Sequence, residues 1–405
     1  MMKDILLITN YWHFKVEKES SRYLFLAEMI SQETDLSLEI VTSSFYHATK
    51  KQRKYNNDFL DSFEYKVSLI NEPGYKKNIS FRRLYSHNIF ARNVLKYLKK
   101  RKRPDFIYLV VPSLDVADKI SKYADQHNIP LIVDIQDLWP EAFKMAIDIP
   151  VISDVLFYPM MKKANRIYSR AERILAVSNT YVQRGLRVNK KDDDGLSVYI
   201  GTDLKYANYC IDKYKNIRTD SRFWITYVGA LGYSYDIKLI IDAIEKLNEK
   251  GIENILFNVL GDGPLRKEFE QYANEKKVCT NFMGMVEYPK MMGILASSNV
   301  AVNPIVKKSV SSIINKVGDY AAAGIPVINT QNSNEYRSLL DEYGAGINCN
   351  TLDDVVSAIE LLYIDKEKQK SMAIASKKIG EQYFDRNVTY RYIIKCIKDL
   401  TNGGD

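Results

Sequence analysis

Short apolar runs alternate with longer amphipathic segments along the first half of the chain. The apolar runs predict β-strands at 4–9, 38–43, 106–111, 130–134, 173–177 and 197–200. The segments between them space their apolar positions as helices do, and they predict helices at 20–32, 88–103, 114–127, 151–170 and 179–188. Continuously apolar strands separated by helices are typical of a parallel sheet with both faces covered.

The same rhythm restarts after residue 205. Strands are predicted at 223–228, 255–260, 279–283, 299–303 and 325–328. Helices are predicted at 236–249, 264–275, 289–297, 315–323, 352–362 and 366–383, with a last helix at 386–401. The two halves share this rhythm but not their residues, so the chain is not a sequence repeat.

The pattern therefore predicts an α/β protein with two Rossmann-like, doubly wound parallel-sheet domains. Residues 189–216 are polar, charged and irregular, and they are the linker candidate. We expect domains at 1–204 and 205–384, and a C-terminal helix at 385–405 that packs back on the first domain. Open parallel sheets bind ligands at the carboxyl ends of their strands. Two such sheets facing each other make a deep cleft for two ligands that must meet, which favours a transferase.

Composition narrows the classes of protein. A length of 405 residues suits two domains, and 46% hydrophobic with 27% charged residues excludes a disordered chain. No apolar run is long enough for a transmembrane helix, and the N-terminal residues 1–12 predict a strand, not a signal peptide. The four cysteines are scattered and the four histidines form no closely spaced pair, so we expect a reduced, cytoplasmic protein without a metal site.

Three common motifs are missing. No G-x-G-x-x-G follows the first strand, which removes the main support for a dinucleotide-dependent dehydrogenase. No G-x-x-x-x-G-K-[ST] occurs, which excludes a P-loop kinase or ATPase, and no G-x-S-x-G elbow supports an α/β-hydrolase.

Four stretches of the second half combine strand ends, glycine turns and helix starts. They are "YVGALGYSYDIKLIIDAI" (227–244), "VLGDGPLRKEF" (259–269), "NFMGMVEY" (281–288) and "KKSVSSIINKVGDYAAAGIPVIN" (307–329). Glycines let backbone N–H groups approach a ligand, and a helix N-terminus favours an anion. Each turn alone is more often plain punctuation of the chain, but their order and spacing together are much more specific.

Together these stretches resemble the donor-binding domain of the GT-B glycosyltransferases, specifically the family-4 (group 1) type that makes capsule, lipopolysaccharide and other cell-surface polysaccharides. The first half adds "VDIQDLWPEAF" (133–143) and "RILAVSNTYVQRG" (173–185), and "VYIGTD" (198–203) stands at the domain junction. The resemblance covers essentially the whole chain. It implies the GT-B fold, a nucleotide-sugar donor in the second domain and an acceptor in the first.

The family signature is a Glu, seven residues, and a second Glu that opens "EAMAAGxPV". This chain reads "DYAAAGIPV", so the second acid maps to Asp319 and the first to Ser311. The resemblance implies that Asp319 holds the donor ribose and that Lys316 serves the sugar and diphosphate, whereas Ser311 cannot replace an anion. The donor-binding residues implied in this way are Gly229, Gly232, Ser234, Gly261, Gly263, Met283, Lys307, Ser311, Ser312, Ile313, Lys316 and Asp319.

The chain departs from the family at the diphosphate clamp. The family has an Arg just after "VG" and a Lys shortly after it, whereas this chain has Ala230 and Leu231, followed by "YSYD". Backbone N–H groups of the turn 229–234 supply part of the missing charge in this interpretation. The cations that remain as candidates are Lys307, Lys308, Lys316 and Arg266. Tyr235 and Asp236 are further donor candidates, and an ordinary helix start is the alternative for both.

On the acceptor side, Asp137 and His13 are the catalytic candidates. Asp137 follows a strand and precedes Trp139-Pro140, where it could orient or deprotonate the acceptor hydroxyl, and a helix cap is the alternative. His13 lies in the first strand–helix loop, and an ordinary surface histidine is the equal alternative. Asp134 and Gln136 share the ambiguity of Asp137. Ser20 and Ser21 are better helix caps than phosphate ligands.

The formal net charge of +8 falls entirely in residues 1–194. Basic runs at 50–54, 75–85 and 98–105 suit an anionic membrane surface or a solvated face. No nucleic-acid motif accompanies them, so we expect no nucleic-acid partner. The amphipathic stretch 151–170 could touch a membrane, although packing on the core is the commoner reason for such a pattern.

The resemblance implies a retaining, metal-independent hexosyl- or N-acetylhexosaminyl-transferase. It would use no cofactor and move a sugar from a nucleotide-sugar, UDP-linked, to a polyprenyl-diphosphate-linked glycan or an oligosaccharide. The enzyme would lie on the cytoplasmic face of the plasma membrane as a peripheral protein. Two alternatives remain open. One is a nucleotide-sugar epimerase or phosphorylase of the same fold. The other is a catalytically silent glycan-binding homologue, suggested by Ser311 and the missing clamp.

Overall fold

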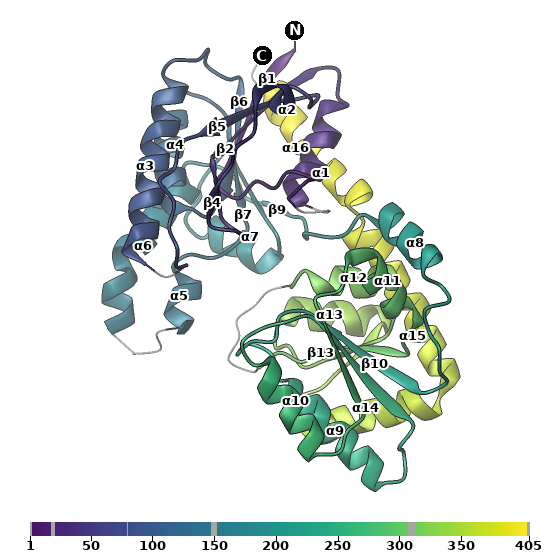
Figure 1. The fold of residues 1–405 in the computed structure, drawn as a ribbon. Coiled ribbons are helices and arrows are strands. Elements are labelled where there is room, and N and C mark those ends of the chain that lie inside the picture. Colours follow the sequence, from purple (N-terminus) through teal and green to yellow (C-terminus); the bar gives the residue numbers. More distant parts are fainter. Residues whose placement is uncertain (1, 18–20, 79, 147–151, 307–312, 403–405) are drawn as a thin grey trace. The chain divides into compact units, whose positions relative to one another are not determined.

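The computed structural model describes residues 2–17, 21–78, 80–146, 152–306 and 313–402 (Figure 1). The chain divides into two compact units, each of which is described by itself. Unit 1 comprises Met1–Val198 and Tyr390–Asp405, and unit 2 comprises Tyr199–Thr389. Within the described ranges, no helix combines the length and the apolar character that crossing a membrane requires.

Unit 1 contains a parallel sheet with the strand order β5-β2-β1-β6-β7-β8-β9. Its strands are β1 (Lys3–Thr9), β2 (Leu36–Ser43), β5 (Lys66–Ile70), β6 (Phe106–Val111), β7 (Leu131–Ile135), β8 (Arg173–Ala176) and β9 (Leu196–Ser197). A small antiparallel hairpin joins β3 (Phe45–Tyr46) and β4 (Lys51–Gln52). The helices are α1 (Arg22–Ser31), α2 (Asn57–Leu60), α3 (Phe81–Leu98), α4 (Leu114–Gln126), α5 (Glu141–Ala146), α6 (Ile152–Ser169), α7 (Asn179–Leu186) and the part of α16 (Arg386–Asn402) from Tyr390 onward.

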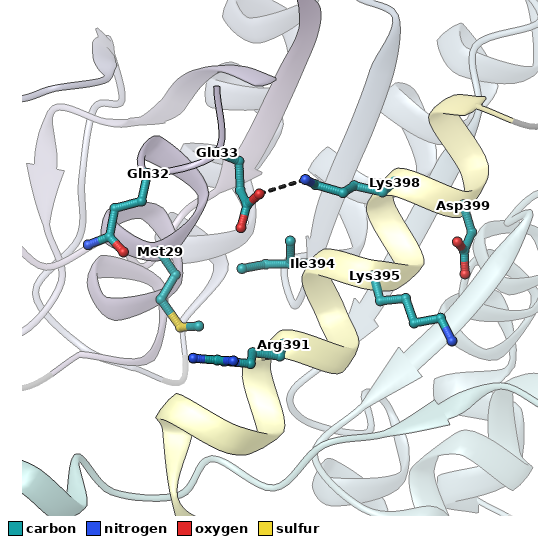
Figure 2. A pocket seen from close by; sticks show the side chains of 8 residues that line it. All are labelled: Met29, Gln32, Glu33, Arg391, Ile394, Lys395, Lys398 and Asp399. Atoms are coloured by element: carbon teal, nitrogen blue, oxygen red, sulfur yellow. Dashed lines mark hydrogen bonds and ion pairs between the residues drawn. The ribbon is translucent and has the colours of Figure 1, made fainter. Parts of the chain in front are cut away.

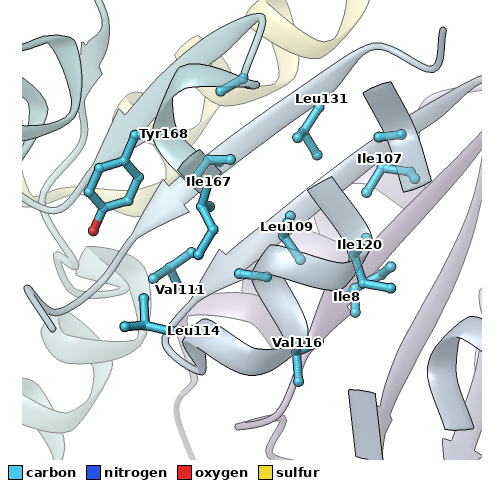
Figure 3. Packing of buried hydrophobic residues seen from close by; sticks show 14 of the residues in the cluster. Ile8, Ile107, Leu109, Val111, Leu114, Val116, Ile120, Leu131, Ile167 and Tyr168 are labelled. Atoms are coloured by element: carbon cyan, nitrogen blue, oxygen red, sulfur yellow. The ribbon is translucent and has the colours of Figure 1, made fainter. Parts of the chain in front are cut away.

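The sequence of the central strand β6 is apolar throughout because both of its faces are buried. Successive side chains of a strand point to opposite faces, and here both faces are covered. Ile107, Leu109 and Val111 belong to the core cluster that also contains Ile120 of α4 (Figure 3). The intervening side chains belong to a second cluster that contains residues of α1 and α16. The sheet is therefore buried on both sides.

Asp134 of β7 is part of this buried framework. It is fully buried, and it accepts hydrogen bonds from Tyr108 (2.6 Å), Tyr23 (3.1 Å) and Gln136 (2.6 Å). The guanidinium of Arg22 on α1 lies 3.5 Å from its Oδ2. A buried carboxylate needs such partners because desolvation otherwise penalises its charge. Asp134 and Gln136 thus serve the packing of unit 1.

Helix α16 packs on α1 within unit 1. Lys398 forms ion pairs with Glu33 (2.6 Å) and Asp35 (3.1 Å). A groove of about 660 Å³ is lined by residues of both helices. Figure 2 shows Met29 of α1 and Gln32, just after its last residue, on one side, and Arg391 and Lys395 of α16 on the other. Both acidic and basic side chains line this groove, so it presents no single sign of charge.

Unit 2 repeats the architecture with the strand order β12-β11-β10-β13-β14-β15, again parallel. Its strands are β10 (Phe223–Val228), β11 (Ile255–Leu260), β12 (Thr280–Gly284), β13 (Val300–Asn303), β14 (Val327–Asn329) and β15 (Gly346–Asn348). Its helices are α8 (Leu204–Lys213), α9 (Ile237–Glu249), α10 (Arg266–Glu275), α11 (Tyr288–Ser297), α12 (Lys316–Ala323), α13 (Asn334–Tyr343), α14 (Leu352–Ile364), α15 (Lys366–Ile379), followed by a π-helical turn η1 (Gly380–Phe384) and the start of α16.

Several expectations differ from the structure. The linker candidate 189–216 is not irregular throughout, because it contains α8. Asp203 is the N-cap of this helix, and its carboxylate accepts a hydrogen bond from the backbone N–H of Tyr206. Strands β5 and β15 and helix α13 were not expected. Ser21 stands at the N-cap of α1 but makes no capping hydrogen bond with its side chain, and Ser20 lies outside the described residues.

Candidate functional site

The glycine turns after β10 and β11 lie against each other at the carboxyl end of the second sheet. Gly229 has φ +144° and Gly261 has φ +138°, values that side chains with a Cβ rarely adopt. A Cβ atom on Gly261 would lie 1.9 Å from the carbonyl oxygen of Gly229, and one on Gly263 would lie 2.3 Å from that of Leu231. Close backbone contact is thus sufficient reason for glycine at 261 and 263.

A cavity of about 320 Å³ opens at these turns, a size at the lower end of the range for small-molecule sites. It is lined by Val228, Gly229, Ala230, Leu260, Gly261, Asp262, Met285, Val286 and Met291. Its walls are largely apolar side chains, with exposed backbone of the two glycine turns between them. This combination can hold a flat, weakly polar ring and present N–H groups to an attached anion.

Lys316, the first residue of α12, is buried next to Gly229. Its Nζ lies 4.0 Å from the ring centroids of both Tyr227 and Tyr235 and has no hydrogen-bond partner in the part of the chain that the structure describes. Burial lowers the pKa of this amine well below its ordinary value. A buried ammonium supported only by two ring faces is costly to keep charged, so it favours an anion that can approach it.

Asp319 lies one turn further along α12 and is half-buried. Its Oδ1 accepts hydrogen bonds from the hydroxyls of Thr202 (2.5 Å) and Tyr288 (3.0 Å). Burial raises the pKa of Tyr288, and the charge of this carboxylate raises it further. These contacts fix the orientation of the Asp319 side chain within unit 2.

The other donor candidates lie in several different surroundings. Gly232 has open space around it and Ser234 is exposed. Met283 and Ile313 pack in the hydrophobic cluster that also contains Leu260 and Met291, but neither lines the cavity. Lys307, Lys308, Ser311 and Ser312 lie outside the described residues.

Arg266 and Asp236 have local partners. Arg266 Nε donates to Glu270 (2.7 Å) and its Nη1 lies 3.6 Å from Asp262, so its charge is balanced within unit 2. Asp236 caps α9 by accepting from the backbone N–H of Leu239 at 3.1 Å, which is the alternative that the sequence left open. Among the described cation candidates, only Lys316 is both buried and without a carboxylate partner.

In unit 1, His13 and Asp137 line the same cavity of about 240 Å³. The cavity lies where β1, β6 and β7 end, and its full lining is Asn10, Tyr11, Trp12, His13, Tyr46, His47, Arg83, Pro112, Asp137 and Trp139. His13 Nδ1 lies 3.3 Å from the hydroxyl of Tyr46, and Asp137 Oδ2 accepts from the indole N–H of Trp139 at 3.0 Å. His13 and Asp137, which are 124 positions apart in the sequence, therefore line the same cavity.

Burial shapes the charges of this cavity. It raises the pKa of Asp137, against the opposing effect of the Trp139 hydrogen bond. It lowers the pKa of His47 to about 4, with further lowering by Lys50 and Arg83. At neutral pH the His47 ring is therefore uncharged.

Two arginines of the basic runs are structural. Arg53 is 2% exposed at its side chain and pairs with Glu17 at 2.8 Å, and Arg101 pairs with Asp4 (2.9 Å) and Glu39 (3.0 Å). They cannot belong to a solvated or membrane-facing surface in this structure.

Sequence reasoning missed Met285, Arg83 and His47. Met285 follows Gly284, whose φ of +69° turns the chain at the end of β12, so that Met285 and not Met283 lines the cavity. Arg83 was read only as one charge in the run 75–85, because no pattern distinguishes it from its exposed neighbour Arg82.

The chain is similar to known proteins at two levels: in the sequence of residues 222–365 and in the fold of almost the whole chain. Residues 222–365 match the family model described as "Glycosyl transferases group 1". A search of curated protein sequences finds no match.

Solved structures match almost the whole chain. HepE from Anabaena in complex with UDP has a TM-score of 0.71 at 14% identity, over 98% of this chain and 100% of its own. Sucrose-phosphate synthase from Thermosynechococcus elongatus has 0.72 at 13%, over 99% and 100%. WaaG, a glycosyltransferase involved in lipopolysaccharide biosynthesis, has 0.66 at 13%, over 99% and 100%. The chain therefore has the GT-B fold of two Rossmann-like domains, and its residues 222–365 match the group 1 glycosyltransferase family.

Proposed function

We propose that this glycosyltransferase retains the anomeric configuration and moves a sugar from a UDP-sugar to a lipid-linked or oligosaccharide acceptor in the synthesis of a bacterial cell-surface polysaccharide. The observation that carries the donor assignment is the buried Nζ of Lys316 beside Gly229, which has no hydrogen-bond partner among the described residues. Support for UDP comes from the similar fold of HepE, which was solved with UDP. Support for the polysaccharide comes from the similar fold of WaaG.

In this proposal the cavity after β10 and β11 holds the nucleoside, and Lys316 meets the diphosphate. Bringing two phosphate charges to a desolvated amine favours its protonated form. The resulting charge-assisted hydrogen bond is strong because the site has little competing water. The proposal assigns the charge of the leaving diphosphate to Lys316 and to backbone N–H groups of the turn 229–234, and it requires no metal ion or cofactor.

We propose that Asp319 binds the donor ribose. Thr202 and Tyr288 already hold its carboxylate in place, so little side-chain entropy is lost when ribose hydroxyls bind. The shorter side chain of Asp still offers two oxygens as acceptors.

His13 and Asp137 are proposed to orient the acceptor hydroxyl. Their common cavity gives both side chains access to one small ligand. Because burial raises the pKa of Asp137, its carboxyl is a better proton acceptor than an exposed aspartate.

We also propose that unit 1 binds an anionic membrane surface on the cytoplasmic side. Exposed apolar side chains on α3 and α6 support this, namely Phe81 (91% exposed), Leu84, Tyr85, Val155 (72%), Leu156 and Tyr158. Exposed cations such as Lys76, Lys77 and Arg82 accompany those on α3. Apolar side chains flanked by lysine and arginine are typical of interfacial binding.

The test is calorimetric titration of the full chain with UDP and GDP. Asp319→Asn should weaken UDP binding at least tenfold, whereas the control Asp353→Asn, on an 83%-exposed side chain, should not change it. Unchanged UDP affinity in Asp319→Asn would refute the donor assignment. Turnover of UDP-sugar without any acceptor would indicate an epimerase and not a transferase. Binding of donor and acceptor without any product would indicate a catalytically silent homologue.

A further inference from the structure

The cavity of unit 1 that holds His13 and Asp137 also contains an arginine that forms no ion pair with any carboxylate of the described residues. Arg83 lies in the first turn of α3 and is half-buried. Its charge lowers the pKa of Glu72 and of Asp137 against the effect of their burial, but neither carboxylate lies within ion-pair distance of its guanidinium. Its polar contacts are instead neutral: Nη2 donates to the hydroxyl of Tyr11 (2.7 Å) and Nη1 donates to the carbonyl of Asn78 (2.9 Å).

Other arginines of unit 1 show that this is an exception. Each of the remaining arginines that the structure describes there as buried or half-buried forms an ion pair. These are Arg22 with Asp134, Arg53 with Glu17, Arg101 with Asp4 and Glu39, Arg170 with Asp118, Arg173 with Asp192, and Arg184 with Glu141. A partly desolvated guanidinium without such a counterion is expected to take its anion from a ligand.

The guanidinium is held rigidly toward the cavity. Its Cζ lies 4.7 Å from the ring centroid of Trp139 and 5.5 Å from that of Tyr75. Its Nε is buried and lacks a hydrogen-bond partner among the described residues. The fixed orientation reduces the entropy that ligand binding must overcome, and the planar fork suits an oxyanion with two oxygens.

A second, independent group in the same cavity lacks a partner. The side chain of Asn10 is 4% exposed, and its Nδ2 has no hydrogen-bond acceptor within the described ranges. Asp137 is the one carboxylate of the lining, and its Oδ2 is engaged by Trp139. Donors without acceptors therefore outnumber acceptors without donors in the lining.

We propose that this cavity binds a phosphate ester, with Arg83 as the charged contact and Asn10 as a neutral donor. The inference rests on the proposed function in one respect, because it assigns this phosphate to the sugar acceptor. The aromatic rings of Tyr11 and Trp139 beside the guanidinium would pack against a sugar face. The phosphate could belong to a soluble sugar phosphate or to a polyprenyl carrier, and the exposed Phe81 and Leu84 on the same turns of α3 favour the carrier.

Tryptophan fluorescence can report this site directly. The chain contains three tryptophans, and two of them, Trp12 and Trp139, line the cavity, whereas Trp224 lies in β10 of unit 2. The full chain, saturated with UDP to occupy unit 2, is titrated with inorganic phosphate, glucose 1-phosphate and undecaprenyl phosphate in detergent micelles. Micelles without lipid phosphate are the blank. A saturable change that Trp139→Phe reduces is the expected result.

Variants separate the proposal from a general effect of charge. Arg83→Gln should weaken phosphate binding at least tenfold, Arg83→Lys should retain part of it, and Arg92→Gln, at an exposed arginine of the same helix, should leave it unchanged. If Arg83→Gln does not fold, Asn10→Ala takes its place and should weaken binding several-fold. Equal affinity in wild type and Arg83→Gln would overturn the proposal, and so would an equal loss in Arg92→Gln.

The remaining outcomes identify the source of the phosphate and isolate the two hypotheses. Tighter binding of undecaprenyl phosphate than of glucose 1-phosphate supports the carrier, and the reverse order supports a soluble acceptor. UDP binding without phosphate binding overturns this inference alone. Phosphate binding without UDP binding or transfer overturns the proposed function and leaves the phosphate site in place.

Discussion

The Nζ of Lys316 lies 3.0 Å from the position that a Cβ atom would occupy on Gly229. The amine and the glycine turn therefore share one small space, and the lack of a side chain at 229 is what keeps the amine next to the cavity. This relationship turns a glycine of a strand–helix turn into a determinant of where the charge lies.

Substitution of Gly229 should therefore affect both stability and donor binding. Gly229→Ala places a Cβ against Lys316 and forces a φ of +144° on an L-residue, which costs about 1–3 kcal/mol. We expect a lower thermal midpoint and at least tenfold weaker UDP binding by calorimetry. Gly251→Ala is the matched control, because Gly251 also has a positive φ of +85°, nothing lies within 4 Å of its Cβ position, and it does not line the cavity. Equal weakening of UDP binding by both substitutions would contradict the role given to the space at Gly229.

Removal of the Lys316 amine should separate stability from binding. Lys316→Met keeps much of the apolar volume and removes a group that is costly to bury, so the free energy of unfolding should rise by about 1 kcal/mol or more. UDP should bind at least tenfold more weakly, whereas uridine, which lacks phosphates, should bind as before. An equal loss for uridine would mean that Lys316 shapes the nucleoside cavity and does not contact phosphate.

Proton uptake is a further signature of Lys316. Burial lowers the pKa of the amine in the folded protein, and a diphosphate nearby raises it again. Calorimetry of UDP binding in buffers with different ionisation enthalpies should show proton uptake at alkaline pH, and Lys316→Met should abolish it. Identical heats in all buffers would contradict this linkage.

His87 should make unit 1 sensitive to acid. It is 1% exposed, and its pKa is lowered to about 3 by burial, and then by Arg83 and His47. The unfolded chain binds a proton near pH 6.5 and the folded chain does not, so stability is complete above pH 6.5 and falls as the pH drops toward 3. The loss is at most about 1.4 kcal/mol per pH unit for this group. We expect the free energy of unfolding, measured by chemical denaturation between pH 7 and pH 4, to fall less steeply with pH in His87→Leu than in wild type. The same pH dependence in both proteins would show that His87 does not cause the acid sensitivity.

Membrane binding by unit 1 should depend on α6. Val155 and Leu156 are 72% and 58% exposed, so replacing both by aspartate should cost little stability. Flotation with vesicles that contain anionic lipid should recover at least fivefold less of this variant, and raised salt should weaken binding of the wild type. Leu361→Asp, at a partly exposed leucine of unit 2, is the control. Unchanged recovery of the α6 variant would mean that α6 does not bind the membrane and that the positive charge of unit 1 lies on an ordinary solvated surface.

The sequence predicts the fold well where apolar periodicity is strong. The run FIYLVV of β6 is buried on both faces, and that is the reason why it contains no charged residue and only one hydroxyl, that of Tyr108, which donates to Asp134. Helix α8 was missed because its pattern is largely polar and only Leu204, Ala207 and Cys210 are buried. Strand β5 was missed because its edge position leaves most of its side chains partly exposed.

The candidate sites depend more on tertiary contacts than on local pattern. Asp319 and Lys316 stand in a motif with a fixed spacing, so the sequence alone is enough to name them as candidates. Arg83 and His47 reach one cavity from different segments, and only the packing of α3 reveals that Arg83 forms no ion pair with a described carboxylate. Gly261 looked like a ligand-binding glycine, although its contact with Gly229 is a packing reason that no single sequence displays.

The contact between the two glycine turns also bears on engineering. Gly261 packs against the carbonyl of Gly229, and Leu265 donates its backbone N–H to the carbonyl of Leu231 at 3.0 Å. The backbone conformation of each turn is therefore matched to that of the other. A chimera that takes residues 229–236 from a relative with another donor preference would meet an unmatched partner at 261–265. Exchange of donor specificity between relatives should therefore succeed only when both turns are transplanted as one cassette.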